Sequence, residues 1–175
     1  MQKRGYKVPP LGGQDIFAIS KELRKQLDMS DVIYMDIAWL LETLGCYDIL
    51  DYEYCEDSDT MHYGEAFYNP VEKKILIPDS VYNAACVGKG RARFTIAHEM
   101  GHFFLKHSAV LGRNNDTTWK AYIDSEWQAD AFAGYFLAPP SLVDPRSTAE
   151  NIAVDFGLSF QAARIALNNA KKFRS

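Results

Sequence analysis

The sequence has few cysteines and no long apolar run. Only three of its 175 residues are cysteines, and none of them forms a Cys-x-x-Cys pair. This usage is typical of a reducing compartment and excludes a disulfide scaffold. No stretch approaches the roughly 18 apolar residues of a membrane span, and the first twenty residues lack the continuous apolar segment of a secretory signal. We therefore expect a cytoplasmic protein with no membrane partner.

The sequence also lacks an excess of basic residues. It has 19 lysines and arginines against 23 aspartates and glutamates, which gives a formal net charge of -4. Non-specific binding of nucleic acid therefore has no electrostatic support at the level of the whole chain. Hydrophobic residues make up 47% and charged residues 24% of the sequence, and these fractions exclude a mainly disordered chain.

Apolar periodicity predicts helices in both halves of the chain and a small sheet between them. Helices are predicted over residues 14–27, 30–44, 79–86, 91–107, 120–138, 147–157 and 159–173, and short strands over residues 47–54, 66–68 and 74–77. This order is typical of an α+β fold. We expect a flexible N-terminal tail over residues 1–13, a main domain over residues 14–145, and a C-terminal helical hairpin over residues 146–175 packed on the same domain. Strand 74–77 is the candidate edge for pairing with a peptide.

The most informative motif is the segment HEMGH at residues 98–102, inside a predicted helix. Residues four apart on a helix project side by side, so His98 and His102 can bind one Zn²⁺ through nitrogens about 2.0–2.1 Å from the ion. Glu99 lies roughly 100° round the helix from His98, which suits a general base better than a ligand. Gly101 costs a helix about 1 kcal/mol relative to alanine, so we expect it to permit close packing.

A catalytic zinc usually has three protein ligands and an open fourth position. Glu126, in the next long predicted helix, is the best candidate for the third ligand. Asp130 lies one turn further on the same face, where it can accept the outer N–H of a ligand histidine. His107 lies about 140° round the helix from His102 and is predicted to be a surface or supporting residue. His62, far upstream, is a weaker candidate ligand.

The predicted metal site therefore comprises His98, His102 and Glu126, with Glu99 as the catalytic residue. This arrangement favours metal-assisted hydrolysis, in which the glutamate takes a proton from water and passes it to the leaving group. Mn²⁺ or another divalent ion fits the same ligands. A donor that stabilises the developing oxyanion is also expected. The sequence leaves four candidates open for this donor: Arg93, His107, Tyr122 and Tyr135.

Three segments together resemble the ImmA/IrrE metallopeptidase family. They are RARFTIAHEMGH at residues 91–102, EWQADAFA at residues 126–133 and LAP at residues 137–139. The family commonly has Asn where this chain has Asp130, and Leu-Met-Pro where it has Leu-Ala-Pro. The resemblance implies a small zincin-like metallopeptidase domain with a short β-sheet and an active-site helix pair. It also implies zinc bound by His98, His102 and Glu126, and a bacterial cytoplasmic endopeptidase. Members of the family cleave helix-turn-helix transcriptional repressors, so the expected partner is such a protein.

Two other functions remain open at this stage. Residues 148–169 have the helix-turn-helix spacing of a DNA-binding module, with Gln161, Arg164 and Asn168 as polar positions on the second helix. Because the chain is acidic overall, direct binding of nucleic acid is a weaker hypothesis than peptide hydrolysis. The second alternative is a binding or scaffold protein that keeps the zinc site and cleaves little or nothing, although Glu99 is intact.

Overall fold

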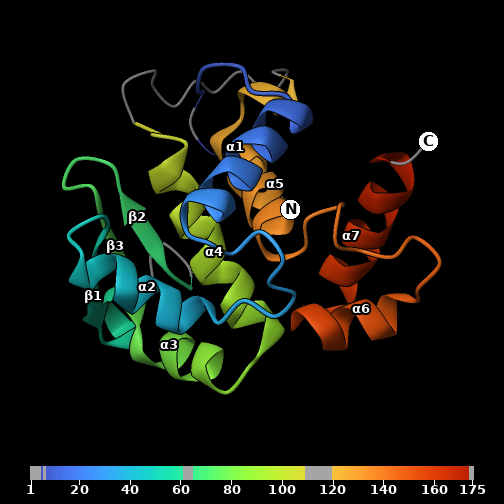
Figure 1. Cartoon of the computed structure of the whole chain (residues 1–175). Helices are drawn as coiled ribbons and strands as arrows, with labels where there is room; N and C mark the ends of the chain where they lie inside the picture. The colour runs from blue at the N-terminus through green and yellow to red at the C-terminus, as the bar shows by residue number, and fades with distance from the viewer. Residues whose placement is uncertain (1–4, 6, 61–64, 109–119, 174–175) are drawn as a thin grey trace.

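The computed structural model describes residue 5 and residues 7–60, 65–108 and 120–173, and these residues form an α+β fold (Figure 1). The helices are α1 (Gly13–Gln26), α2 (Ile37–Cys46), α3 (Asp79–Cys86), α4 (Gly90–Phe104), α5 (Ser125–Leu137), α6 (Ala149–Phe156) and α7 (Phe160–Phe173). The strands are β1 (Asp51–Cys55), β2 (Phe67–Asn69) and β3 (Lys74–Pro78).

The three strands form one sheet in the order β1-β3-β2. β1 runs parallel to β3, and β2 runs antiparallel to it, with Tyr68 opposite Ile75. The prediction that strand 74–77 lies at an edge is therefore wrong. Ile75 and Ile77 of this strand are fully buried, which fits its central place in the sheet. The edge nearest to α4 belongs to β2 instead.

Helices α4 and α5 lie side by side in the middle of the molecule (Figure 1). The sheet with α2 and α3 lies on one side of this pair, and α6 and α7 lie on the other, while α1 packs against α5. One hydrophobic core runs through these elements and includes Leu41, Ile96, Phe132, Phe156 and Ala163. The central helix pair is therefore packed against apolar side chains of the other helices and of the sheet.

Two helices begin later than their apolar periodicity predicts. α2 was expected to start near residue 30, but it starts at Ile37 because the Asp36 side chain caps it by accepting the N–H of Trp39. α5 was expected from residue 120. Its first residue is Ser125, since Asp124 caps the helix by accepting the N–H of Glu126. The cap thereby places Glu126 in the first turn of α5.

The C-terminal helices end and begin close to the predicted residues. The cap of α6 is Thr148, whose hydroxyl accepts the N–H of Asn151 at 3.2 Å, whereas the sequence pattern predicted Ser147. Gly157 ends α6 with φ 61°, a left-handed conformation that suits glycine. Ser159 caps α7 as predicted, because its hydroxyl accepts the N–H of Ala162 at 3.3 Å.

Part of the N-terminal segment does not form a free tail, in contrast to the prediction for residues 1–13. The N–H of Val8 donates to the carbonyl of Ile123 at 3.0 Å, and the N–H of Leu11 donates to the carbonyl of Tyr122 at 2.9 Å. Val8 is buried, with 3% of its surface exposed. Residues 7–11 therefore lie alongside residues 122–123, in the segment that leads into α5. None of the described helices has the length and apolar character needed to cross a bilayer.

Candidate metal centre

Both histidines of the HEMGH segment lie on α4, and their ring nitrogens meet the Glu126 carboxylate at the start of α5. The Nε2 atoms of His98 and His102 are 3.1 Å apart. Each Nε2 atom is 3.5 Å from an oxygen of Glu126, which turns Oε2 toward His98 and Oε1 toward His102. One ligand atom from each of the three residues can be chosen so that all three atoms lie within 4.8 Å of one another. The structure thus brings together the three residues that the sequence predicted as metal ligands.

The spacing of these donor atoms fits a tetrahedral ion. Two ligands bound about 2.05 Å from zinc at the tetrahedral angle lie about 3.3 Å apart, close to the separations between His98, His102 and Glu126. The local field also favours a cation. Burial alone lowers the pKa of His98, but the carboxylates of Asp130 and Glu126 outweigh it and raise that pKa to about 10. The group therefore has both the geometry and the charge to hold a divalent cation.

The Glu99 carboxylate lies beside this group and is held by the edge of the sheet. Its Oε2 atom accepts the backbone N–H of Tyr68 in β2 at 2.7 Å. Its Oε1 atom is 4.0 Å from the Nε2 atom of His98, on the side of the ligand group. Glu99 is nearly buried, with 8% of its surface exposed. One carboxylate oxygen is therefore anchored, while the other faces the metal ligands.

Asp130 and His107 lie behind the two ligand histidines. The Nδ1–H of His98 donates to the Oδ1 atom of Asp130 at 2.8 Å, as the sequence predicted. The Nδ1 atom of His102 contacts the Nδ1 atom of His107 at 2.9 Å. Burial lowers the pKa of His102 and also that of His107, so both rings are neutral near pH 7. Each ligand histidine therefore has a partner on the nitrogen that faces away from the group.

Gln128 is a residue of the site that the sequence reasoning missed. It is fully buried in α5, and its Oε1 atom lies 2.9 Å from the Nε2 atom of His107. The only signal for Gln128 in the sequence is a large amide between small and apolar residues of a helix, close to the Glu126 ligand.

His107 is buried, with 5% of its surface exposed. It is therefore a supporting residue, and the alternative of a surface position is wrong.

The structure also reduces the list of candidate oxyanion donors. Arg93 is buried and donates to the carbonyls of Met35, Phe156 and Gly157. Its guanidinium thus joins α4 to the end of α6 and does not face the ligand group. Both ring nitrogens of His107 already contact other side chains, those of His102 and Gln128. Tyr122 and Tyr135 remain as the candidates named from the sequence, while the candidate ligand His62 lies outside the described residues.

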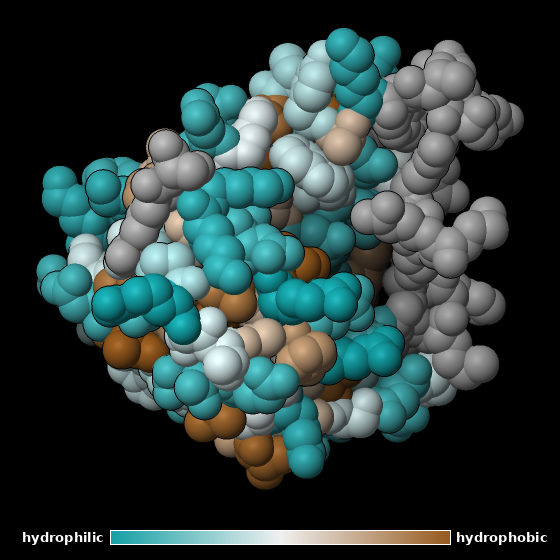
Figure 2. All heavy atoms as spheres, turned by 90° about the vertical axis from the view of Figure 1, so that its right-hand side faces the viewer, coloured by the Kyte–Doolittle hydropathy of each residue, from teal (hydrophilic) through white to brown (hydrophobic). Residues whose placement is uncertain are grey.

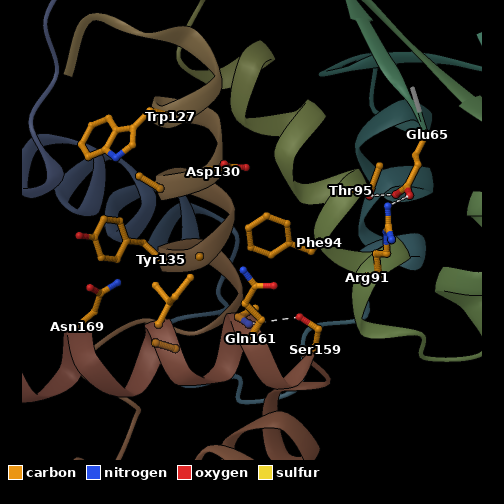
Figure 3. A pocket seen from close by; sticks show the side chains of 15 residues that line it. Glu65, Arg91, Phe94, Thr95, Trp127, Asp130, Tyr135, Ser159, Gln161 and Asn169 are labelled. Carbon is orange, nitrogen blue, oxygen red and sulfur yellow. Dashed lines mark hydrogen bonds and ion pairs between the residues drawn. The ribbon is translucent and has the colours of Figure 1, made fainter. Parts of the chain in front are cut away.

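A groove of about 560 Å³ adjoins the site between α5 and α7. Figure 3 shows Trp127 and Tyr135 of α5 along one side and Phe94 of α4 near the middle. An ion pair between Arg91 and Glu65 lies at one end (Figure 3). Asp130 also lines the groove, so the groove adjoins the side of His98 that faces away from the metal ligands. Its aromatic lining is typical of surfaces that bind apolar groups.

Gly101 allows α4 and α5 to approach each other closely. A Cβ atom at this position would lie 3.0 Å from the ring of Phe132 and 3.2 Å from the backbone of Ala129. The side chains before and after it on α4 belong to the ligand group or pack in the core. The close packing predicted for this glycine is confirmed, and it sets the distance between the histidines and Glu126.

Replacement of Gly101 by Val is expected to lower the free energy of unfolding by about 1–3 kcal/mol, because the larger side chain overpacks the helix contact. Thermal unfolding of the metal-free protein measures this effect. Gly134→Ala is the matched control, since a Cβ there meets nothing within 4 Å. This control is expected to stabilise the helix by about 0.5–1 kcal/mol. Equal stability of Gly101→Val and the unmodified protein would show that the contact is not tight.

Taken together, the α+β fold and the His-His-Glu group define a metal site of the HExxH type, completed by a glutamate from a second helix. Residues 60–168 match the model of the Peptidase_M78 family, described as the IrrE N-terminal-like domain. The match covers more than half of the chain, and the chain belongs to this peptidase family. The resemblance drawn from the motifs is therefore confirmed. Among curated proteins, no sequence gives a significant match.

Proposed function

We propose that this chain is a zinc-dependent endopeptidase that cleaves a cytoplasmic regulatory protein, such as a helix-turn-helix transcriptional repressor. One observation carries the proposal. The Glu99 carboxylate lies beside the donor atoms of His98, His102 and Glu126, with one of its oxygens facing them. A metal site that only stabilises the fold has no use for such a carboxylate, and structural zinc sites are usually closed by four protein ligands.

In the proposed mechanism, each residue of the site has a separate role in peptide hydrolysis. His98, His102 and Glu126 would hold the ion, which supplies a Lewis acid that activates water and polarises the scissile carbonyl. Glu99 accepts the proton of the attacking water on Oε1 and delivers it to the leaving nitrogen. The hydrogen bond from the N–H of Tyr68 fixes Oε2, so the carboxylate keeps its orientation during this transfer.

Zinc is the ion that the donor set favours. Two imidazole nitrogens and one carboxylate are typical of catalytic zinc sites, which leave a fourth position for water or substrate. Mn²⁺ prefers a larger number of oxygen ligands, so it is the second choice for this group. Asp130 supports the zinc assignment because a carboxylate bound to the outer N–H of a ligand histidine strengthens that ligand.

The resemblance to the family supports a protein as the substrate, and the C-terminal hairpin has few features that would favour DNA. The described part of the hairpin, residues 146–173, carries four basic residues, Arg146, Arg164, Lys171 and Lys172, and two acidic residues, Glu150 and Asp155. Figure 2 shows the side of the molecule on which this hairpin lies, and hydrophilic residues with small separate apolar patches cover most of it. An excess of two positive charges, on a chain with a formal net charge of -4, gives only weak attraction to phosphates, so a protein substrate is the better proposal.

Co-expression with the repressor encoded beside its gene tests this function. Mass spectrometry of the repressor is expected to show discrete fragments with the unmodified protein and the intact repressor with Glu99→Gln. Fragments that persist with Glu99→Gln would point to another protease and contradict the proposal. Equal binding of the repressor without cleavage by either protein would favour a scaffold.

A further inference from the structure

A buried chain of hydrogen bonds leads from the N-terminal segment to one of the ligand histidines. It begins at Gln128, whose amide has two contacts at 2.8–2.9 Å to the carbonyls of Tyr122 and Pro9. Backbone carbonyls only accept hydrogen bonds, so the amide atom that faces them must be the NH₂ group. The Oε1 atom of Gln128 therefore faces His107 as an acceptor, independently of how the amide atoms are assigned.

This orientation determines where the protons lie on the next two rings. Because Gln128 Oε1 only accepts, the Nε2 atom of His107 must donate to it across 2.9 Å. The His107 ring is buried against the uncharged amide of Gln128, and such burial favours the neutral form of a ring. A neutral imidazole has one donor and one acceptor nitrogen, so the Nδ1 atom of His107 is an acceptor. It lies 2.9 Å from the Nδ1 atom of His102, which must then be the donor. The remaining nitrogen of His102, Nε2, keeps its lone pair and faces His98 and Glu126.

We propose that Gln128 and His107 are positioning residues that hold His102 with its proton on Nδ1, so that Nε2 is available to a metal ion. This inference rests on the proposed metal site. A histidine can ligate only through an unprotonated nitrogen, and a neutral histidine side chain in water populates both tautomers. The buried chain selects one tautomer and fixes the ring plane before an ion binds.

The two ligand histidines are therefore supported in different ways. His98 donates to the carboxylate of Asp130, which has 47% of its side-chain surface exposed. His102 donates to a neutral ring, and both His107 and Gln128 are buried. The second support adds no charge next to the ligand group. It also joins the group to the N-terminal segment, because the carbonyl of Pro9 is one of the two acceptors that orient Gln128.

Nitrogen-15 NMR of the metal-free chain of 175 residues tests the inference directly, because it distinguishes protonated from unprotonated ring nitrogens. The expected spectrum shows a proton on Nδ1 of His102 and on Nε2 of His107. A proton on Nε2 of His102, with Nδ1 unprotonated, would overturn the proposal. In Gln128→Met, which removes the acceptor, a mixture of tautomers at His107 and His102 is expected, and an unchanged spectrum would also overturn it.

Zinc affinity, measured by competition with a chelator, provides the second readout. His107→Leu removes the acceptor for His102 and is expected to weaken zinc binding about 10- to 100-fold. His107→Asn, whose carbonyl oxygen can stand where Nδ1 was, is expected to restore most of that affinity. Equal affinities of these two variants would contradict a positioning role. Absence of zinc binding in the unmodified protein, with the expected tautomers present, would reject the proposed function while leaving the hydrogen-bond chain in place.

Discussion

Replacement of Glu99 by Gln is expected to slow cleavage of the substrate by about 100- to 10,000-fold, which is the usual contribution of a general acid–base group. Gln has nearly the same shape as Glu, and its carbonyl oxygen can still accept the N–H of Tyr68. It cannot take a proton from water at neutral pH. The loss is therefore expected in kcat, measured as the rate of fragment formation at saturating repressor.

The metal content and the stability of this variant separate chemistry from structure. Glu99 is not one of the three donors of the ligand group, so Glu99→Gln is expected to bind zinc as tightly as the unmodified protein. Glu150→Gln is the control, because this exposed glutamate lies on α6, away from the ligand group. The rate at which Glu150→Gln cleaves the substrate is expected to equal that of the unmodified protein. A Glu99→Gln variant that retains full activity would contradict the assignment of the general base.

The second large effect is expected at Arg93, where substitution by Leu should lower the free energy of unfolding by at least about 3 kcal/mol. The Arg93 side chain, 1% exposed, donates to three carbonyls and lies 4.1 Å from the ring of Tyr34. Its loss leaves the carbonyls of Met35, Phe156 and Gly157 buried without this donor. Each unsatisfied group costs about 1–3 kcal/mol. Denaturant unfolding of the metal-free protein measures the change.

Arg91 provides a matched control on the same helix. Its side chain is 82% exposed and forms an ion pair with Glu65. Exposed ion pairs contribute about 0–1 kcal/mol, so Arg91→Leu is expected to change the free energy of unfolding by no more than this amount. Similar losses for the two variants would show that Arg93 does not tie α4 to the end of α6.

The ligand group could be predicted from the sequence because helix geometry alone determines most of it. The spacing of His98 and His102 places both rings on one face of α4, whatever the rest of the fold does. Glu126 and Asp130 are likewise one turn apart on a second helix. Gly101 already indicated close packing at this point of the helix, and the structure shows that the close neighbour is α5.

The features that the sequence did not predict depend on contacts between distant segments. The order of the strands places β3 in the centre of the sheet. The apolar run of residues 75–77 fits a central strand, but which strands pair with it depends on contacts between distant segments. The hydrogen bonds of Gln128 join α5 to the segment after α4 and to Pro9. A buried amide of this kind looks like any surface glutamine in the sequence, because two of its three partners are 21 and 119 positions away.

The central claim is that two helices present three donors to one divalent ion. A crystal structure of the zinc-loaded protein, with diffraction measured at the zinc absorption edge, tests it most directly. We expect one anomalous peak about 2.0–2.2 Å from Nε2 of His98, Nε2 of His102 and a carboxylate oxygen of Glu126. A crystal with no peak at this position, or with the ion bound while Glu126 points away from it, would contradict the account.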